Sequence, residues 1–113
     1  MDNVKNYTRL IRDALDSYVS LTTKFPSPDY EVIQVYDNEH QHYLVRKLGW
    51  KKSDRIQHTV LHVALRNNKI WIEEDLTEDG IATYFIEHGV PPTDIVLGFQ
   101  PPLMRPYTEF AVA

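Results

Sequence analysis

Apolar residues recur at spacings of three and four along the first part of the chain: Val4, Tyr7, Leu10, Ile11, Leu15, Tyr18 and Leu21. Residues at these spacings share one face of a helix, so the pattern predicts a helix over residues 2–21. Asp2 or Asn3 is expected to cap its first turn. Pro26 and Pro28 follow, and because proline lacks the amide donor that a continuing helix uses, the helix is expected to end before them.

Four segments rich in β-branched and aromatic residues come next, and this composition is typical of strands. The expected strands span residues 30–37, 42–48, 55–65 and 69–74. Gly49 is expected to end the second strand. Asn67 and Asn68 predict a hairpin turn, because asparagine tolerates the left-handed backbone that tight turns require. Short polar turns between successive strands indicate an antiparallel meander.

A second helix is predicted from Thr77 to His88. Thr77 suits the N-cap, and the two acidic residues after it favour the positive end of the helix dipole. Gly80 costs a helix stability relative to alanine, so we expect it to serve close packing. Gly89 stands just past the helix, where left-handed closure is common.

The last part of the chain has a weaker pattern. Residues 92–95 are expected to begin one short helical turn, and residues 95–99 a fifth strand or an extended segment. Three prolines after them predict an irregular, extended tail. Tyr107 and Phe110 are apolar, which is unusual in a frayed terminus. We therefore expect both to pack on the sheet or across a subunit boundary.

These elements predict one α+β domain over residues 1–113: an N-terminal helix, a four-stranded antiparallel β-meander, a second helix and a short C-terminal strand or extended tail. The 113 residues suffice to bury a core. Hydrophobic residues at 42% and charged residues at 25% are ordinary values for globular domains. With both helices on one face, the sheet has another face and two edges to cover, so we expect a homodimer.

Composition and charge exclude several classes of protein. A net charge of -4 weighs against a protein that wraps nucleic acid by electrostatics alone. Cysteine is absent, which excludes disulfides and thiolate chemistry. No apolar run approaches the roughly 20 residues of a spanning helix, and the N-terminus lacks the apolar core of a signal peptide. The cytoplasm is the expected location, with no membrane contact.

One stretch, residues 46–55, is basic, and it is the candidate for contact with nucleic acid. Its basic residues are Arg46, Lys47, Lys51, Lys52 and Arg55. So few phosphate contacts bind weakly, and the order of elements contains no helix-turn-helix to enter a groove. Direct DNA binding is therefore not favoured.

The histidines and acids give no clear catalytic or metal site. His58 and His62 are four apart in a strand, hence about 13 Å apart, so they cannot chelate one metal by themselves. His40 and His42 lie beside a turn without a third ligand, so ordinary sheet and turn histidines are favoured over a zinc site. Two interpretations of the acids between Glu73 and Asp79 are open. They form a magnesium site, or they are solvent-exposed charges at the junction of the fourth strand and the second helix, which we call the solvated junction.

The solvated junction is favoured, with Asp75 and Thr77 stabilising the turn and capping the helix. No serine lies in a nucleophile elbow, and no phosphate loop or dinucleotide fingerprint occurs. We therefore assign no catalytic residue, metal ligand or cofactor.

Two groups of residues in the second half form recognisable motifs. The first is Lys69-Ile70-Trp71-Ile72, Asp75-Leu76-Thr77-Glu78 and Gly80-Ile81-Ala82; the second runs from Asp94 to Phe99 and continues through Pro102, Arg105 and Thr108 to Ala113. Together with His42-Tyr43 and Leu48-Gly49-Trp50, they resemble the XisI family of cyanobacterial excision-controlling factors over nearly the whole chain. Leu76 and Gln100 depart from the glycine and histidine common there. The motif residues without an assigned role are Trp71, Asp75, Thr77, Glu78, Gly80, Gly98, Phe99, Arg105, Glu109 and Phe110.

The resemblance implies an accessory role in site-specific recombination, in which a DNA element that interrupts a nitrogen-fixation gene is excised. It also implies a separate recombinase and a partner protein of the XisH type, which resembles nucleases. Three hypotheses follow, in order of preference. The protein is a non-catalytic module that binds another protein, a DNA-binding factor that uses residues 46–55, or a metal-dependent enzyme with its acids near Asp75.

Overall fold

The computed structural model describes residues 3–113, with side chains from residue 6 onward. Helix α1 spans Asn3–Thr22 and confirms the first predicted helix. Its buried face carries Tyr7, Ile11, Ala14 and Leu15, which follow the three and four spacing of the sequence pattern. The cap expected at Asp2 or Asn3 lies outside the described side chains.

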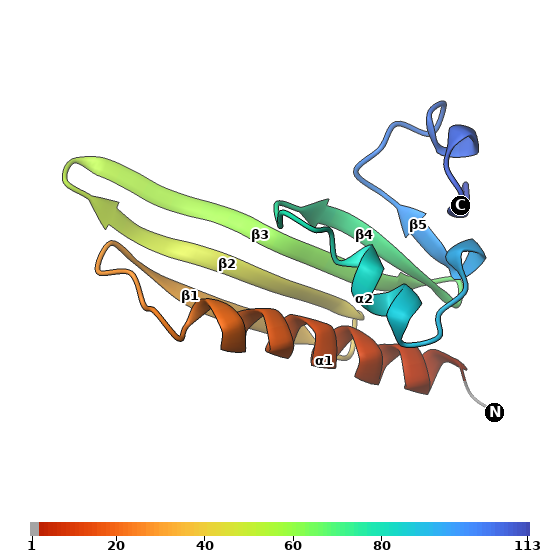
Figure 1. Cartoon of the computed structure of the whole chain (residues 1–113), viewed down its shortest axis with the longest axis horizontal. Helices are drawn as coiled ribbons and strands as arrows, with labels where there is room; N and C mark the ends of the chain where they lie inside the picture. Colours follow the sequence, from red (N-terminus) through yellow and green to blue (C-terminus); the bar gives the residue numbers. More distant parts are fainter. Residues whose placement is uncertain (1–2) are drawn as a thin grey trace.

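Five strands form one sheet in the order β1-β2-β3-β4-β5 (Figure 1). The first four are antiparallel neighbours and confirm the meander: β1 Tyr30–Asp37, β2 His42–Lys51, β3 Asp54–Arg66 and β4 Lys69–Asp75. The fifth strand, β5 Ile95–Leu97, pairs with β4 in parallel. The chain reaches β5 only after a crossover through the second helix, as a parallel neighbour requires.

Strand β2 continues through Gly49, where the sequence predicted its end. A Cβ atom at Gly49 would lie 1.9 Å from the carbonyl oxygen of Asp29. The Trp50 amide donates a hydrogen bond to the same oxygen at 2.9 Å. Gly49 therefore allows the chain that enters β1 to close onto β2, and it does not end the strand.

Helix α2 spans only Ala82–Glu87, so the prediction of a helix from Thr77 to His88 was wrong at its start. Ile81 holds the N-cap position without a side-chain cap bond. Gly80 has a φ of 82°, a left-handed backbone that glycine adopts readily and that interrupts a helix. Gly89, with a φ of 92°, confirms the predicted closure. The short 3-10 helix η1, Pro92–Asp94, confirms the predicted turn.

Both helices lie on the same face of the sheet, so the chain has the predicted α+β fold (Figure 1). The main core lies between them and the sheet, and includes Leu15, Tyr43, Leu61, Ile72 and Phe85. We call the other side of the sheet the open face, because neither α1 nor α2 covers it. Within residues 3–113, no helix is long and apolar enough to cross a membrane.

After β5 the chain leaves the sheet and then returns to it (Figure 1). We call residues 99–108 the C-terminal lobe; it contains the 3-10 helix η2, Arg105–Tyr107. Ala111 returns to β5 and its amide donates to the Ile95 carbonyl at 2.8 Å. Phe110 packs partly against the core, as predicted. Tyr107 does not pack on the sheet, since 84% of it is exposed at the tip of the lobe.

Candidate functional site

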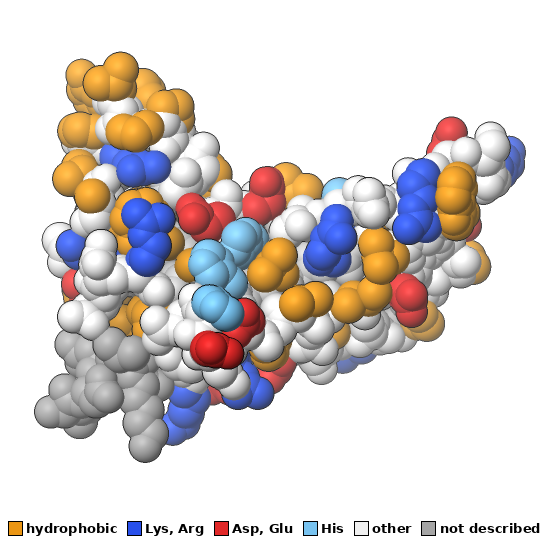
Figure 2. Space-filling view, turned by 180° about the vertical axis from the view of Figure 1, so that it is seen from behind, with side chains coloured by type: hydrophobic (Ala, Val, Ile, Leu, Met, Phe, Trp, Pro, Cys, Tyr) orange, Lys and Arg blue, Asp and Glu red, His pale blue; other side chains and the backbone are white. Residues whose placement is uncertain are grey.

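The C-terminal lobe presents large apolar side chains to solvent. Leu103 and Tyr107 are 85% and 84% exposed, and Phe99 and Met104 are 47% and 51% exposed. Figure 2 shows hydrophobic side chains gathered over this projecting part of the molecule, at the upper left. Exposed apolar clusters of this kind mark surfaces that contact another molecule. The lobe is therefore the first candidate site.

Arg105 holds the lobe in its folded shape. Its guanidinium donates hydrogen bonds to the backbone carbonyls of Gln100 at 3.1 Å, Val112 at 3.3 Å and Gly98 at 3.4 Å. These acceptors come from the start of the lobe and from the segment that returns to the sheet. The five fixed donors of arginine suit this task, which lysine with one ammonium group could not perform in the same way.

Trp71 forms the floor on which Arg105 rests. The Arg105 guanidinium lies 5.4 Å from the centre of the Trp71 ring, and that of Arg66 lies 4.0 Å from it. Both contacts have cation–π geometry. Trp71 is buried with Ala64 and Val96 in a small second core on the open face. Its indole nitrogen is buried and has no hydrogen-bond partner among residues 3–113.

Gly98 lets the chain leave β5 close to its neighbour. A Cβ atom there would lie 2.0 Å from a carboxylate oxygen of Glu73 and 3.2 Å from the Ile72 carbonyl. The next amide, that of Phe99, donates to that same Ile72 carbonyl at 3.3 Å. The motif residues Trp71, Gly98 and Arg105 thus shape and hold one structure, the lobe.

Asp75 organises the loop that leads into α2. One carboxylate oxygen accepts hydrogen bonds from the amide of Thr77 at 2.9 Å and from its hydroxyl, and the other accepts from the Ile81 amide at 2.6 Å. This confirms the expected turn, although Thr77 does not cap the helix. Thr77, Glu78 and Gly80 line a shallow groove between this loop and α1. Glu109, the remaining motif residue, is exposed.

His42 and His62 form a pair on the open face, the face on which Figure 2 shows histidine side chains gathered. The ring nitrogens Nδ1 of His42 and Nε2 of His62 are 2.9 Å apart. A bulge in β4 places Glu73 and Glu74 beside them, with Glu74 opposite His62. Burial lowers the pKa of His62, and the neighbouring His42 lowers it further, while the two carboxylates act in the opposite direction.

The other histidines stand apart from this pair. His40 contacts Asp37 at the surface, with 2.7 Å between Nδ1 and a carboxylate oxygen. His58 pairs with Lys47 and His62 with Leu44, which are three apart on β2 and so point to opposite faces. The β-bulge in β3 therefore separates the two histidines that alternation alone placed on one face.

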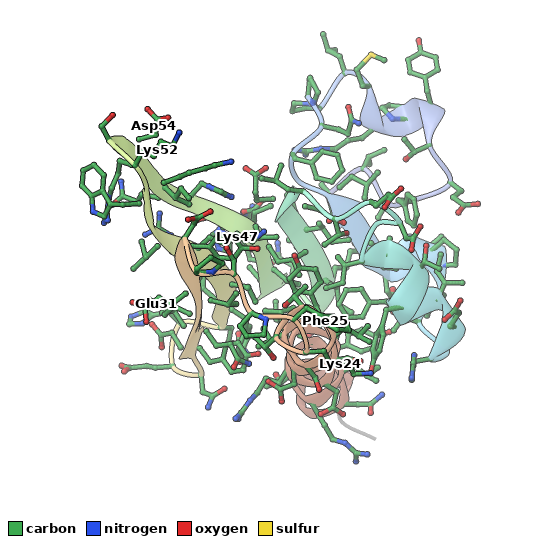
Figure 3. All side chains as sticks on the ribbon, turned by 60° about the vertical axis from the view of Figure 1, so that its left-hand side comes forward. Lys24, Phe25, Glu31, Lys47, Lys52 and Asp54 are labelled. Atoms are coloured by element: carbon green, nitrogen blue, oxygen red, sulfur yellow. The ribbon has the colours of Figure 1, made fainter. Side chains whose placement is uncertain are left out.

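The basic stretch does not form one patch. From the register, Arg46 and Arg55 lie on the open face, whereas Lys47 and Lys51 point to the helix side. Lys47 lies over the Tyr30 ring at 4.6 Å. Lys52 stands at the tip of the β2–β3 hairpin beside Asp54, far from Lys47 (Figure 3).

The acids and histidines do not assemble into a metal centre in the part of the chain that the structure describes. No group of three or more His, Asp or Glu residues among residues 3–113 is placed to hold an ion. The acids near Asp75 are instead divided by the fold. Glu73 and Glu74 belong to the open face, and Asp75 turns toward the loop before α2.

Sequence reasoning missed two features of the site. The His42–His62 contact depends on the register of β2 and β3 and on the bulge between Val45 and Arg46, and a hairpin turn at residues 52–53 does not by itself indicate that bulge. The lobe was predicted as irregular tail. Leu103 and Met104 at its exposed tip were not singled out, and Tyr107 was expected to pack on the sheet or across a subunit boundary. The signal was an apolar composition between prolines, next to an arginine of the motif.

Comparisons with known proteins point to one group. The model of the XisI protein family matches residues 1–112. A crystal structure of a XisI-like protein from Anabaena variabilis ATCC 29413 is similar with a TM-score of 0.90 and 35% identity, covering 97% of this chain and 99% of that chain. The crystal structure of the fdxN element excision controlling factor XisI from the same organism has a TM-score of 0.89 and 36% identity, covering 99% and 100%. No curated protein is similar enough to count as a match.

Proposed function

This chain belongs to the XisI family, and we propose that it is a non-catalytic accessory factor that controls excision of a DNA element through a protein partner of the XisH type. A solved relative that is 36% identical is named an excision controlling factor. A factor that acts through a protein partner needs a surface for that contact, and the surface best suited to it is the C-terminal lobe.

The observation that carries this proposal is an exposed apolar tip on a well-anchored support. Leu103 and Tyr107 project almost fully into solvent, while Arg105 fixes the backbone that presents them. Binding energy at protein interfaces concentrates in a few apolar, aromatic and arginine side chains. A segment that is ordered before binding also loses less conformational freedom when the complex forms.

The proposal is tested by mixing the purified protein with its XisH-type partner and separating the mixture by size-exclusion chromatography with light scattering. The proposal expects one peak that contains both chains, at micromolar concentration and physiological salt. Two separate peaks at concentrations of about 100 µM, where even weak complexes associate, would refute it.

A second experiment distinguishes this function from direct DNA binding. The dispersal of Lys47 and Lys51 away from Arg46 and Arg55 leaves few cations to contact one DNA backbone, and few phosphate contacts give weak binding. We therefore expect no gel shift of duplex DNA by this protein alone at micromolar concentration. The gel shift of duplex DNA should appear when the XisH-type partner is present, either by itself or mixed with this protein. A strong shift by this protein alone, weakened by Arg46→Glu with Arg55→Glu, would favour the DNA-binding alternative.

A further inference from the structure

The open face of the sheet forms the floor of a broad hollow. Figures 2 and 3 show the C-terminal lobe rising at one end and the tip of the β2–β3 hairpin at the other. Strand register places a mixed set of side chains on this floor: Ile33, Val35, Leu44, Arg46, Leu48, Trp50, His62 and Glu74. Val35 and Trp50 are 46% and 56% exposed. Large apolar side chains exposed together on a sheet face mark a surface that contacts another molecule.

The charges on this floor are separated and unpaired. Glu74 lies opposite His62 in the pairing of β3 with β4, and Glu73 is next to it. No cation forms an ion pair with either acid among the described residues. Arg46 has only a neutral partner, since its Nε donates to the Thr59 hydroxyl at 3.2 Å.

The distance between these charges follows from the register. Arg46 lies two strands away from Glu74 and two residues further toward the hairpin tip. The two positions are therefore about 12 Å apart in the plane of the sheet. Glu73 and Glu74 thus lie apart from Arg46 on the same surface, while the guanidinium groups of Arg66 and Arg105 lie over the Trp71 ring.

Such a surface is complementary to itself. A two-fold axis that lies in the plane of the interface, and that crosses the line from Arg46 to Glu74 at its midpoint and at a right angle, brings each residue opposite the other in a second copy. The contact then occurs twice, as every contact in a two-fold interface does. The same operation places Leu44 of one copy against the His62 region of the other, so that apolar surface is covered near the axis.

We propose that the open face is a dimer interface in which Arg46 of each copy pairs with Glu73 and Glu74 of a second copy of this chain. The interface is distinct from the tip of the C-terminal lobe, at Leu103 and Tyr107, so the proposal stands or falls independently of the proposed function.

The test uses two opposite charge reversals, Arg46→Glu and Glu74→Arg, and analytical ultracentrifugation at micromolar concentration. The wild-type protein is expected to be a dimer. Each variant alone places two like charges opposite each other twice, which raises the Kd of the dimer at least about tenfold. In an equimolar mixture of the two variants, a heterodimer contains one native Arg46–Glu74 pair and one pair of reversed sign, so both contacts are attractive and a heterodimer should form.

The mixture makes the test specific. Circular dichroism melting of each variant shows that it is folded, and Lys24→Glu, beside the end of α1 (Figure 3), is a matched control that should leave the dimer unchanged. A wild-type monomer at about 100 µM would overturn the proposal. Dimers that survive both single reversals, or variants that stay monomeric when mixed, would also overturn it.

Discussion

Replacing Arg105 tests how the C-terminal lobe is held. Arg105→Ala removes hydrogen bonds to the carbonyls of Gln100, Val112 and Gly98, and it removes the contact with the Trp71 ring. Two of the three bonds are long and all are partly accessible to water, so each contributes about 0.5 kcal/mol, the low end of the usual range. The cation–π contact adds about 0.5 kcal/mol. The free energy of opening the lobe should therefore fall by about 2 kcal/mol.

Hydrogen exchange measures this opening directly. A change of about 2 kcal/mol raises the population of the open lobe, and hence amide exchange, about thirty-fold. The reporting amides are those of Phe99, bonded to Ile72, and Ala111, bonded to Ile95. Amides in the β2–β3 hairpin should keep their wild-type rates, because the lobe can open without unfolding the sheet.

A matched control separates the hydrogen bonds from the stacking contact. Arg66→Ala removes the other guanidinium over Trp71, at 4.0 Å, but no bond to the lobe. Exchange at Phe99 and Ala111 should change little in that variant. Unchanged exchange in Arg105→Ala, or an equal rise in both variants, would refute the view that Arg105 fixes the lobe through its backbone carbonyls.

Two further predictions concern stability. Tyr7 donates a hydrogen bond to Asp94 at 2.5 Å, which joins α1 to η1, and burial with this carboxylate raises the pKa of Tyr7 to about 12. Tyr7→Phe should lower the free energy of unfolding by about 1–2 kcal/mol in urea titrations; an unchanged midpoint would contradict the role of this bond. In the folded protein, burial and the neighbouring His42 lower the pKa of His62, although Glu73 and Glu74 act in the opposite direction. The unfolded chain therefore binds more protons than the folded protein below about pH 6.5. Stability should therefore fall between about pH 7.5 and about pH 5.5, and it should fall less in His62→Gln at equal protein concentration; an equal loss in both proteins would disprove the linkage.

The elements that the sequence predicted well are those with local signals. The spacing of Ile11 and Leu15 defines a helix whatever packs against it, and the Asn67–Asn68 turn defines a hairpin. Gly49 and Gly80 were misinterpreted because their roles depend on contacts that no spacing pattern shows. The Asp29 carbonyl, from a distant segment, approaches Gly49. The Asp75 carboxylate, from the start of the same loop, binds the Ile81 amide just beyond Gly80.

The site was harder to predict for the same reason. Arg105 is bonded to backbone carbonyls, and any residue type supplies a carbonyl, so no sequence pattern marks the partners. The two β-bulges shift the register by one residue each, which moves His58 and His62 to opposite faces and brings Glu73 and Glu74 to one face. Alternation of polar and apolar residues cannot show such a shift before the strands are paired.

Calorimetric titration of the XisH-type partner with variants of the lobe tests the central claim most directly. Leu103→Asp and Tyr107→Asp place charges on the exposed tip without touching Arg105 or the core, and Phe25→Asp makes the same change at an apolar residue that is 88% exposed beside α1. The account predicts that each lobe variant weakens binding at least about tenfold, as loss of an interface hot spot does. It also predicts that Phe25→Asp binds like the wild type. Full affinity in both lobe variants, or an equal loss in all three, would contradict it.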